Sequence, residues 1–149
     1  MIQAVTGAGY DVLVMDEALT RYGAVETLAE GKIYADFLDS HRGEYQGIIL
    51  CLPNFGDENG ASEALKHVDV PVLVQAYPDD PAQMDFAHRR DALCGKIAMC
   101  NVLRQLKIRY TLTTKITVSP LSESFAEDLR LFAGTCRTVA GMKQFHIGA

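Results

Sequence analysis

The sequence predicts an α/β protein with a Rossmann-like three-layer α/β/α fold and a mainly parallel sheet of about five strands. Short apolar runs alternate with longer helix-like segments along the chain, the pattern of a parallel sheet with helices on its faces. Two runs, residues 47–53 and 71–77, are apolar on both faces, which is typical of central strands covered by helices. We therefore expect residues 1–149 to form a single domain.

The elements follow one another in a regular order. The chain begins with the end of a helix and a glycine-rich stop, GAG at residues 7–9. Because these glycines precede a predicted strand, they are not a dinucleotide-binding motif. We expect strands, the short apolar runs, near residues 10–15, 47–53, 71–77, 108–114 and 144–149. We expect helices, the longer segments between them, near residues 25–42, 58–66, 85–106 and 122–140.

Composition excludes several classes of protein. A chain of 149 residues buries about 70% of the surface that its unfolded form exposes, enough for an ordinary core. The net charge of -5 and the lack of basic clusters argue against nucleic acid as a partner. The apolar runs are too short to span a membrane, and no signal peptide is visible. We expect a cytoplasmic protein.

The cysteines and histidines do not form a recognisable site. Four of each are dispersed, with no CxxC, HxH or HxxxH spacing, so we expect reduced thiols and no metal. Cys94 lies close to Arg90 and Lys96, which would favour its thiolate. No suitably placed base accompanies it, and free cysteines are often core residues, so we expect a buried, unreactive thiol.

Unusual polar residues gather in three predicted loops. Residues 53–60, 77–90 and 113–123 follow predicted strands and should meet in the crevice where open parallel sheets bind ligands. In the first loop, Asp57 is placed to cap the following helix, and Asn54 suits a tight turn. Alternatively, Asn54 and Glu58 bind a sugar or a facing subunit. The adjacent Asp57 and Glu58 are only a weak metal signal.

Arg89 and Lys96 break the apolar pattern of the predicted helix at 85–106. On a helical wheel both lie in the arc that faces the sheet, where a charge must pair, reach the rim or meet a polar ligand. In one interpretation Asp85 caps the helix and pairs with Arg89, while Lys96 lays its stem on apolar surface. In the other, Arg89, Arg90 and Lys96 donate to an anionic or polyhydroxyl ligand or to a neighbouring subunit. The sequence leaves both open.

Three stretches carry a family resemblance. They are GIILCLPNFGDENG (47–60), PVLVQAYPDD with MDFAHRRDALCGK (71–80 and 84–96), and the segment from TLTTKITVSP to FHIGA (111–149). They resemble, in order and over nearly the whole chain, the N-terminal region of the L-fucose and L-arabinose isomerase superfamily. Arabinose isomerases have a histidine near the position of Cys94, so the similarity is greatest to fucose isomerase-like members.

The resemblance implies a cytoplasmic aldose–ketose isomerase that moves hydrogen between C1 and C2 of a sugar through an enediol, with manganese holding two sugar oxygens. It also implies that the glutamate, aspartate or glutamate, and histidine metal ligands belong to later domains, which this sequence lacks. We therefore expect no catalytic residue, metal site or cofactor in this chain, and no activity of the chain alone.

The resemblance also suggests roles for particular residues. The family's N-terminal region packs against neighbouring subunits and helps to wall the sugar pocket, which points to Arg89, Arg90, Asp91 and Lys96 as pocket or interface residues. The leading hypothesis is a non-catalytic N-terminal-type domain of a truncated or split isomerase. Its partners would be a sugar and either further copies of itself or a chain carrying the catalytic domain. The alternative is a stand-alone sugar-binding or structural oligomerisation module.

Overall fold

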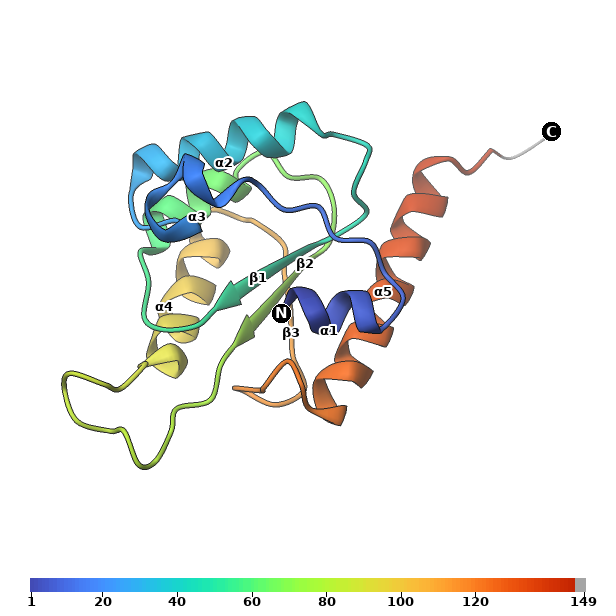
Figure 1. Cartoon of the computed structure of the whole chain (residues 1–149). Helices are drawn as coiled ribbons and strands as arrows, with labels where there is room; N and C mark the ends of the chain where they lie inside the picture. Colours follow the sequence, from blue (N-terminus) through green and yellow to red (C-terminus); the bar gives the residue numbers. More distant parts are fainter. Residues whose placement is uncertain (147–149) are drawn as a thin grey trace.

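The computed structural model describes residues 1–146 as an α/β fold (Figure 1). The helices are α1 (Ile2–Gly7), α2 (Leu28–Ser40), α3 (Glu58–Leu65), α4 (Ala92–Gln105) and α5 (Glu123–Lys143). Two short 3-10 helices, η1 (Glu17–Leu19) and η2 (Arg21–Gly23), precede α2. The strands are β1 (Ile48–Leu52), β2 (Val72–Ala76) and β3 (Thr111–Leu112).

The three strands form one parallel sheet in the order β1-β2-β3. The register pairs Ile48 with Val72 and Leu52 with Ala76, whereas β2 and β3 are joined only at Leu73–Thr111 and Val74–Leu112. Helices α3 and α4 make the two crossovers, as parallel strands require. The predicted α/β class and parallel pairing are confirmed. The described residues contain three strands, not about five.

Helices cover both faces of the sheet. On one face, α3 and α4 pack against alternate strand residues, in a cluster of Leu52, Ala61, Leu65, Val72, Val74, Ala76, Ala92, Met99 and Leu103. On the other face, α1 and α5 contribute Val5, Phe125, Leu129, Phe132 and Cys136 around Leu73 and Val118. All five residues of β2 are buried, which fits its position in the centre of the sheet.

Two glycines allow α2 and α3 to lie close together. A Cβ atom on Gly60 would come within 2.6 Å of the Thr27 carbonyl oxygen and 2.8 Å of a Val25 methyl group. A Cβ atom on Gly31 would collide with the Gly60 backbone. Both are buried, so side chains at these positions would force the helices apart.

The strand expected near residues 10–15 is absent. Within the described chain, no backbone hydrogen bond involves residues 11–15, and Leu13 and Val14 are exposed. Only Met15 is buried. The local sequence suits a strand, but pairing needs a neighbour, and no described strand lies alongside it.

The strands expected near residues 108–114 and 144–149 also need correction. The first is reduced to β3, because Lys107 adopts a left-handed conformation (φ 59°) and the Ile108 N–H bonds back to Leu103 O at 2.9 Å. Ile108 is thereby tied to the end of α4 instead of to β2. Residues 144–146 follow α5, with Gln144 as its C-cap, and form no strand. Residues 147–149 lie outside the described residues.

Helix α4 begins at Ala92, seven residues later than expected. The residue before it, Asp91, has a left-handed backbone (φ 52°) that a continuous helix cannot contain. Arg89 and Arg90 therefore do not lie in the first turn of a helix, where they would face the positive end of its dipole. They belong to an exposed loop that projects from the body of the protein at residues 77–91 (Figure 1).

Candidate functional site

The loops that follow the three strands are held at one end of the sheet by backbone hydrogen bonds. Tyr77 N–H donates to Leu52 O (3.0 Å), and Val118 N–H donates to Ala76 O (2.9 Å). Phe55 N–H donates to Arg90 O (2.8 Å). The first two predicted loops, 53–60 and 77–90, therefore meet directly through Phe55 and Arg90, whereas the third, 113–123, is bonded to the carboxyl end of β2.

Asp79 organises the loop before α4. One carboxylate oxygen, Oδ1, accepts hydrogen bonds from the backbone N–H groups of Arg90 (3.2 Å) and Asp91 (2.9 Å). These bonds hold the backbone at the left-handed Asp91, just before α4 begins. The backbone position of Arg90 is thus set by an acidic residue eleven positions earlier.

Arg90 is exposed and contacts both neighbouring strand ends. Its Nη1 donates to Pro53 O (3.2 Å), and its guanidinium lies over the Tyr77 ring, 5.6 Å from the centroid. Burial raises the pKa of Tyr77, Cys51 adds to this, and the Arg90 charge lowers it in part. A guanidinium has five N–H donors, so the bond to Pro53 leaves several for a ligand.

Arg89 pairs with Asp91, not with Asp85. Its Nε lies 2.8 Å from Asp91 Oδ2, and its guanidinium lies over the exposed Phe86 ring, 5.5 Å from the centroid. Asp85 instead contacts His88 Nδ1 at 2.8 Å, and this hydrogen bond is the main cause that lowers the pKa of Asp85. The expected Asp85–Arg89 pair does not form, although the Arg89 N–H donates to Asp85 O (3.0 Å) as in a helical turn. The Asp85 carboxylate is bonded within its own turn, and the Arg89 side chain reaches Asp91 instead.

Lys96 is buried within the fold, with only 5% of its surface exposed. Its Nζ donates to Thr113 Oγ1 (2.8 Å) and to Ile116 O (2.8 Å), so it ties α4 to the loop after β3. Burial lowers the pKa of Lys96, while Cys100 and Asp128 raise it in part. The interpretation in which the stem of Lys96 packs on apolar surface agrees with its burial. It did not foresee that the ammonium group is bonded to the loop after β3.

The loop that Lys96 holds is fixed from two further elements. Asp128 of α5 accepts hydrogen bonds through Oδ1 from the Thr114 N–H (3.0 Å) and hydroxyl (2.6 Å). Gln75 of β2 donates from Nε2 to Val118 O (2.6 Å). Both side chains are buried, and Gln75 Oε1 and Asp128 Oδ2 have no hydrogen-bond partner among the described residues.

Asn54 and Glu58 lie in the first loop and at the start of α3. A Cβ atom on Gly95 would be 3.1 Å from Phe55 Cα and 3.3 Å from Asn54 O, so this loop packs against the backbone of α4. Asp57 caps α3 by accepting from Asn59 N–H (2.7 Å), as predicted. Glu58 is the first residue of α3 and is partly buried.

Apart from Glu58 at the start of α3, the predicted residues fall into two groups. Asn54, Arg89, Arg90 and Asp91 lie where the first two loops meet, whereas Lys96 reaches the third loop from inside the protein. Cys94 is exposed, contrary to the expectation of a buried thiol, because it lies on a different side of α4 from Met99 and Leu103.

Three important residues were missed from the sequence. Tyr77 directly follows β2, and Asp79 belongs to the polar PDD run at residues 78–80, which resembles an ordinary turn. Asp128 offered a clearer signal: it lies between Phe125, Leu129 and Phe132 on the apolar side of the predicted helix. A lone carboxylate on such a face requires a partner, here Thr114.

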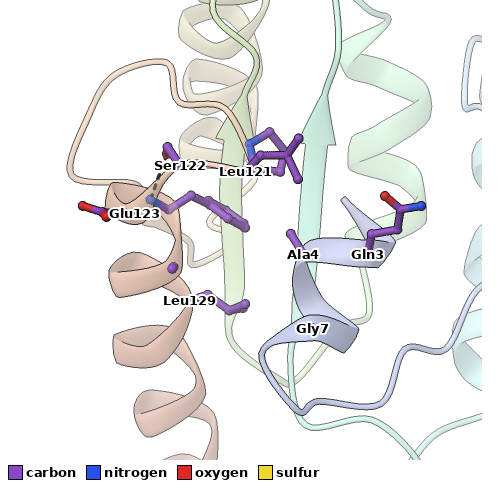
Figure 2. A pocket seen from close by; sticks show the side chains of 10 residues that line it. Gln3, Ala4, Gly7, Leu121, Ser122, Glu123 and Leu129 are labelled. Atoms are coloured by element: carbon purple, nitrogen blue, oxygen red, sulfur yellow. Dashed lines mark hydrogen bonds between the residues drawn. The ribbon is translucent and has the colours of Figure 1, made fainter.

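Hollows in the surface do not coincide with the predicted residues. One, of about 300 Å³, lies between α1 and the start of α5 and is lined by residues such as Ala4, Leu121 and Leu129 (Figure 2). Another, of about 500 Å³, lies at the amino ends of β2 and β3. None of Asn54, Glu58, Arg89, Arg90, Asp91 and Lys96 lines either hollow.

Two further properties concern the described part of the chain. It brings together no group of three or more His, Cys, Asp and Glu side chains that could hold a metal ion. No helix in residues 1–146 has the length and apolarity needed to cross a membrane.

Comparison with known families gives one match. The model of the family described as fucose/sulfoquinovose isomerase, N-terminal domain, matches residues 1–143. Searches of the curated proteins and of the solved structures find no match.

Proposed function

Because the chain belongs to the family of fucose/sulfoquinovose isomerase N-terminal domains, we propose that it is a non-catalytic domain of an aldose–ketose isomerase. In this role it forms part of the sugar-pocket wall and makes subunit contacts. The wall is the surface where the 53–57 and 77–91 loops meet, and its main donor is Arg90.

The observation that carries this proposal is the position of Arg90. Its guanidinium is held between the ends of β1 and β2 by Pro53 O and the Tyr77 ring, yet it stays exposed. A fixed, planar donor beside an aromatic ring suits a polyhydroxyl ligand, and its charge suits an anionic group such as a sulfonate. The hydrogen bonds that Asp79 accepts from the Arg90 and Asp91 N–H groups hold the backbone in this arrangement.

Manganese does not fit the residues of this chain. Asp57 is occupied in capping α3, and no group of three or more His, Cys, Asp and Glu occurs within residues 1–146. We therefore derive no metal-dependent step for this chain. The resemblance to sugar isomerases implies metal ligands in other domains, and the proposed role is therefore that of a wall and a contact surface.

Subunit contacts are proposed for the tip of the 77–91 loop. Residues 80–90 are all exposed, including the apolar side chains of Met84 and Phe86, the latter with 89% of its surface accessible. Exposed apolar side chains grouped on a projecting loop are typical of protein interfaces. The partner is either another copy of this chain or a chain that carries the catalytic domain.

Two measurements test the proposal. The purified chain, supplied with Mn²⁺, should not interconvert L-fucose and L-fuculose or isomerise sulfoquinovose. In NMR titrations with the same sugars, amide shifts should occur in residues 53–57 and 77–91 and saturate. Turnover that is abolished by a chelator would disprove the non-catalytic role, and titrations without shifts in these loops would disprove the pocket-wall role.

A further inference from the structure

A groove opens at the amino ends of β2 and β3, at the end of the sheet opposite Arg90. Strands β2 and β3 pair at only two positions, and the groove is lined by the segments that lead into them, residues 68–72 and 106–110. The groove has a volume of about 500 Å³, and Val139 of α5 contributes to its lining. This volume lies within the range of small-molecule sites in proteins.

The floor of the groove is apolar. Leu65 and Val72 are buried members of the main core, and Val68 and Ile108 pack partly against that core. A ligand that entered the groove would therefore meet aliphatic side chains, which favours an apolar body over a fully polar one.

The rim of the groove is cationic, although the protein as a whole carries a charge of -5. Lys66, Lys107 and Arg109 line it together with a single carboxylate, Asp69. Asp69 is already neutralised, because Lys143 Nζ lies 2.8 Å and Arg42 Nη1 3.6 Å from its carboxylate. The hydrogen bond from Lys143 is the main cause that lowers the pKa of Asp69.

Among the described residues, two of the rim cations have no counterion. Lys66 lies 3.6 Å from Glu63, but within residues 1–146 the side chains of Lys107 and Arg109 make no ion pair or hydrogen bond. The dipole of α4 accounts for a cation at Lys107, which follows its last turn. It does not account for Arg109, which lies two residues further on, because the effect of the dipole is confined to about the last turn of the helix.

We propose that this groove binds a small organic anion, with an apolar body on the aliphatic floor and a phosphate, sulfonate or carboxylate group held by Lys107 and Arg109. The proposal is independent of the sugar-pocket role, because the two regions lie at opposite ends of the sheet and share no residue. Lys66 provides a third, weaker contact, since it also pairs with Glu63.

Phenyl phosphate is a suitable probe, because it combines an aromatic body with an anionic group. In an NMR titration it should shift the amides of residues 66–72 and 106–111 and leave those of 77–91 unchanged. Inorganic phosphate and phenol, which each supply half of the probe, should bind at least tenfold more weakly. Raising the salt concentration to about 0.5 M should weaken binding, because exposed charges are screened.

Substitutions of Lys107 and Arg109 test whether these two residues hold the anionic group. Arg109→Gln combined with Lys107→Asn should weaken phenyl phosphate binding at least tenfold, and asparagine is chosen because it tolerates the left-handed backbone at position 107. Lys32→Gln, at an exposed position on α2, serves as the control and should bind as the wild type does. Unchanged binding by the double variant, or an absence of shifts at 66–72 and 106–111, would overturn the proposal. Equal binding of inorganic phosphate would also overturn it, since the floor would then contribute nothing.

Discussion

The ammonium group of Lys96 donates a hydrogen bond of 2.8 Å to the hydroxyl of Thr113, and so joins the inner side of α4 to the loop that follows β3. The Thr113 hydroxyl in turn donates a hydrogen bond to Lys115 O, at 2.7 Å. A buried lysine is expensive to desolvate, and here both bonded acceptors belong to one loop. Lys96 is therefore a residue that holds the loop in place.

Replacing Lys96 by methionine should lower the free energy of unfolding by about 1–3 kcal/mol, because the variant leaves the buried Thr113 hydroxyl and the partly buried Ile116 carbonyl without their donor. Urea denaturation measures the change, and amide hydrogen exchange should become faster in residues 113–118. Lys32→Met, at an exposed position, provides the control. If both variants unfold at the same urea concentration, Lys96 does not hold the loop.

Gly60→Ala should destabilise the protein by about 1–3 kcal/mol, as overpacking does, because the new methyl group would meet the Thr27 carbonyl oxygen 2.6 Å away. Gly141→Ala is the matched control: nothing lies within 4 Å of its Cβ position in α5. That change should stabilise the protein by up to about 1 kcal/mol through helix propensity. Thermal unfolding of the two variants should therefore shift in opposite directions.

Acid should remove the contribution of Glu30 to stability. Hydrogen bonds from the Glu26 and Arg21 backbone N–H groups lower the pKa of Glu30 from its ordinary value of 4.5. A lowered folded-state pKa means that the stabilisation is complete above about pH 4.5 and is lost as the pH falls through the folded-state pKa.

The test compares the wild type with Glu30→Gln, which retains one acceptor but no charge. The wild type should have the higher melting temperature at pH 7, and the difference should shrink steadily below pH 4.5. Glu26→Gln is the control, because no hydrogen bond to the Glu26 side chain occurs within residues 1–146. A difference that is the same at pH 7 and at pH 3 would contradict the role assigned to the carboxylate.

Arg90→Met should affect ligand contacts more than folding. The guanidinium is exposed, so the loss of its bond to Pro53 and its stacking on Tyr77 should cost no more than about 1 kcal/mol. If the proposed function is correct, the sugar-induced NMR shifts in residues 53–57 and 77–91 should weaken. Arg137→Met, on the exposed side of α5, should leave them unchanged. A large loss of stability without any change in sugar binding would make Arg90 a structural residue.

The sequence predicted the elements whose signals are local. The two central strands were found because their apolar runs are unbroken, and they appear as β1 and β2 within one residue of the expected bounds. Asp57 was recognised as the cap of α3 from its place before the helix. The family resemblance also came from the sequence, and the family model confirms it over residues 1–143.

Other features depended on parts of the chain that are distant in sequence. Residues 10–15 have the composition of a strand, but within the described chain they lack a strand to pair with. The helix expected from residue 85 starts at Ala92, because Asp79 binds the backbone N–H groups of Arg90 and Asp91. This contact spans eleven and twelve residues, beyond the reach of helical periodicity.

The sequence by itself determined the α/β class, the central strands and the family, because periodicity and local motifs are properties of neighbouring residues. Only the tertiary structure decided the roles of the charged residues that had seemed alike. Arg90 ends on the surface between two strand ends, whereas Lys96 ends inside, bonded to Thr113. The elements that pack around a charged side chain decide whether it faces solvent, a ligand or the core. For Lys96 the deciding contact, Thr113, is seventeen residues away, so local sequence patterns do not reveal it.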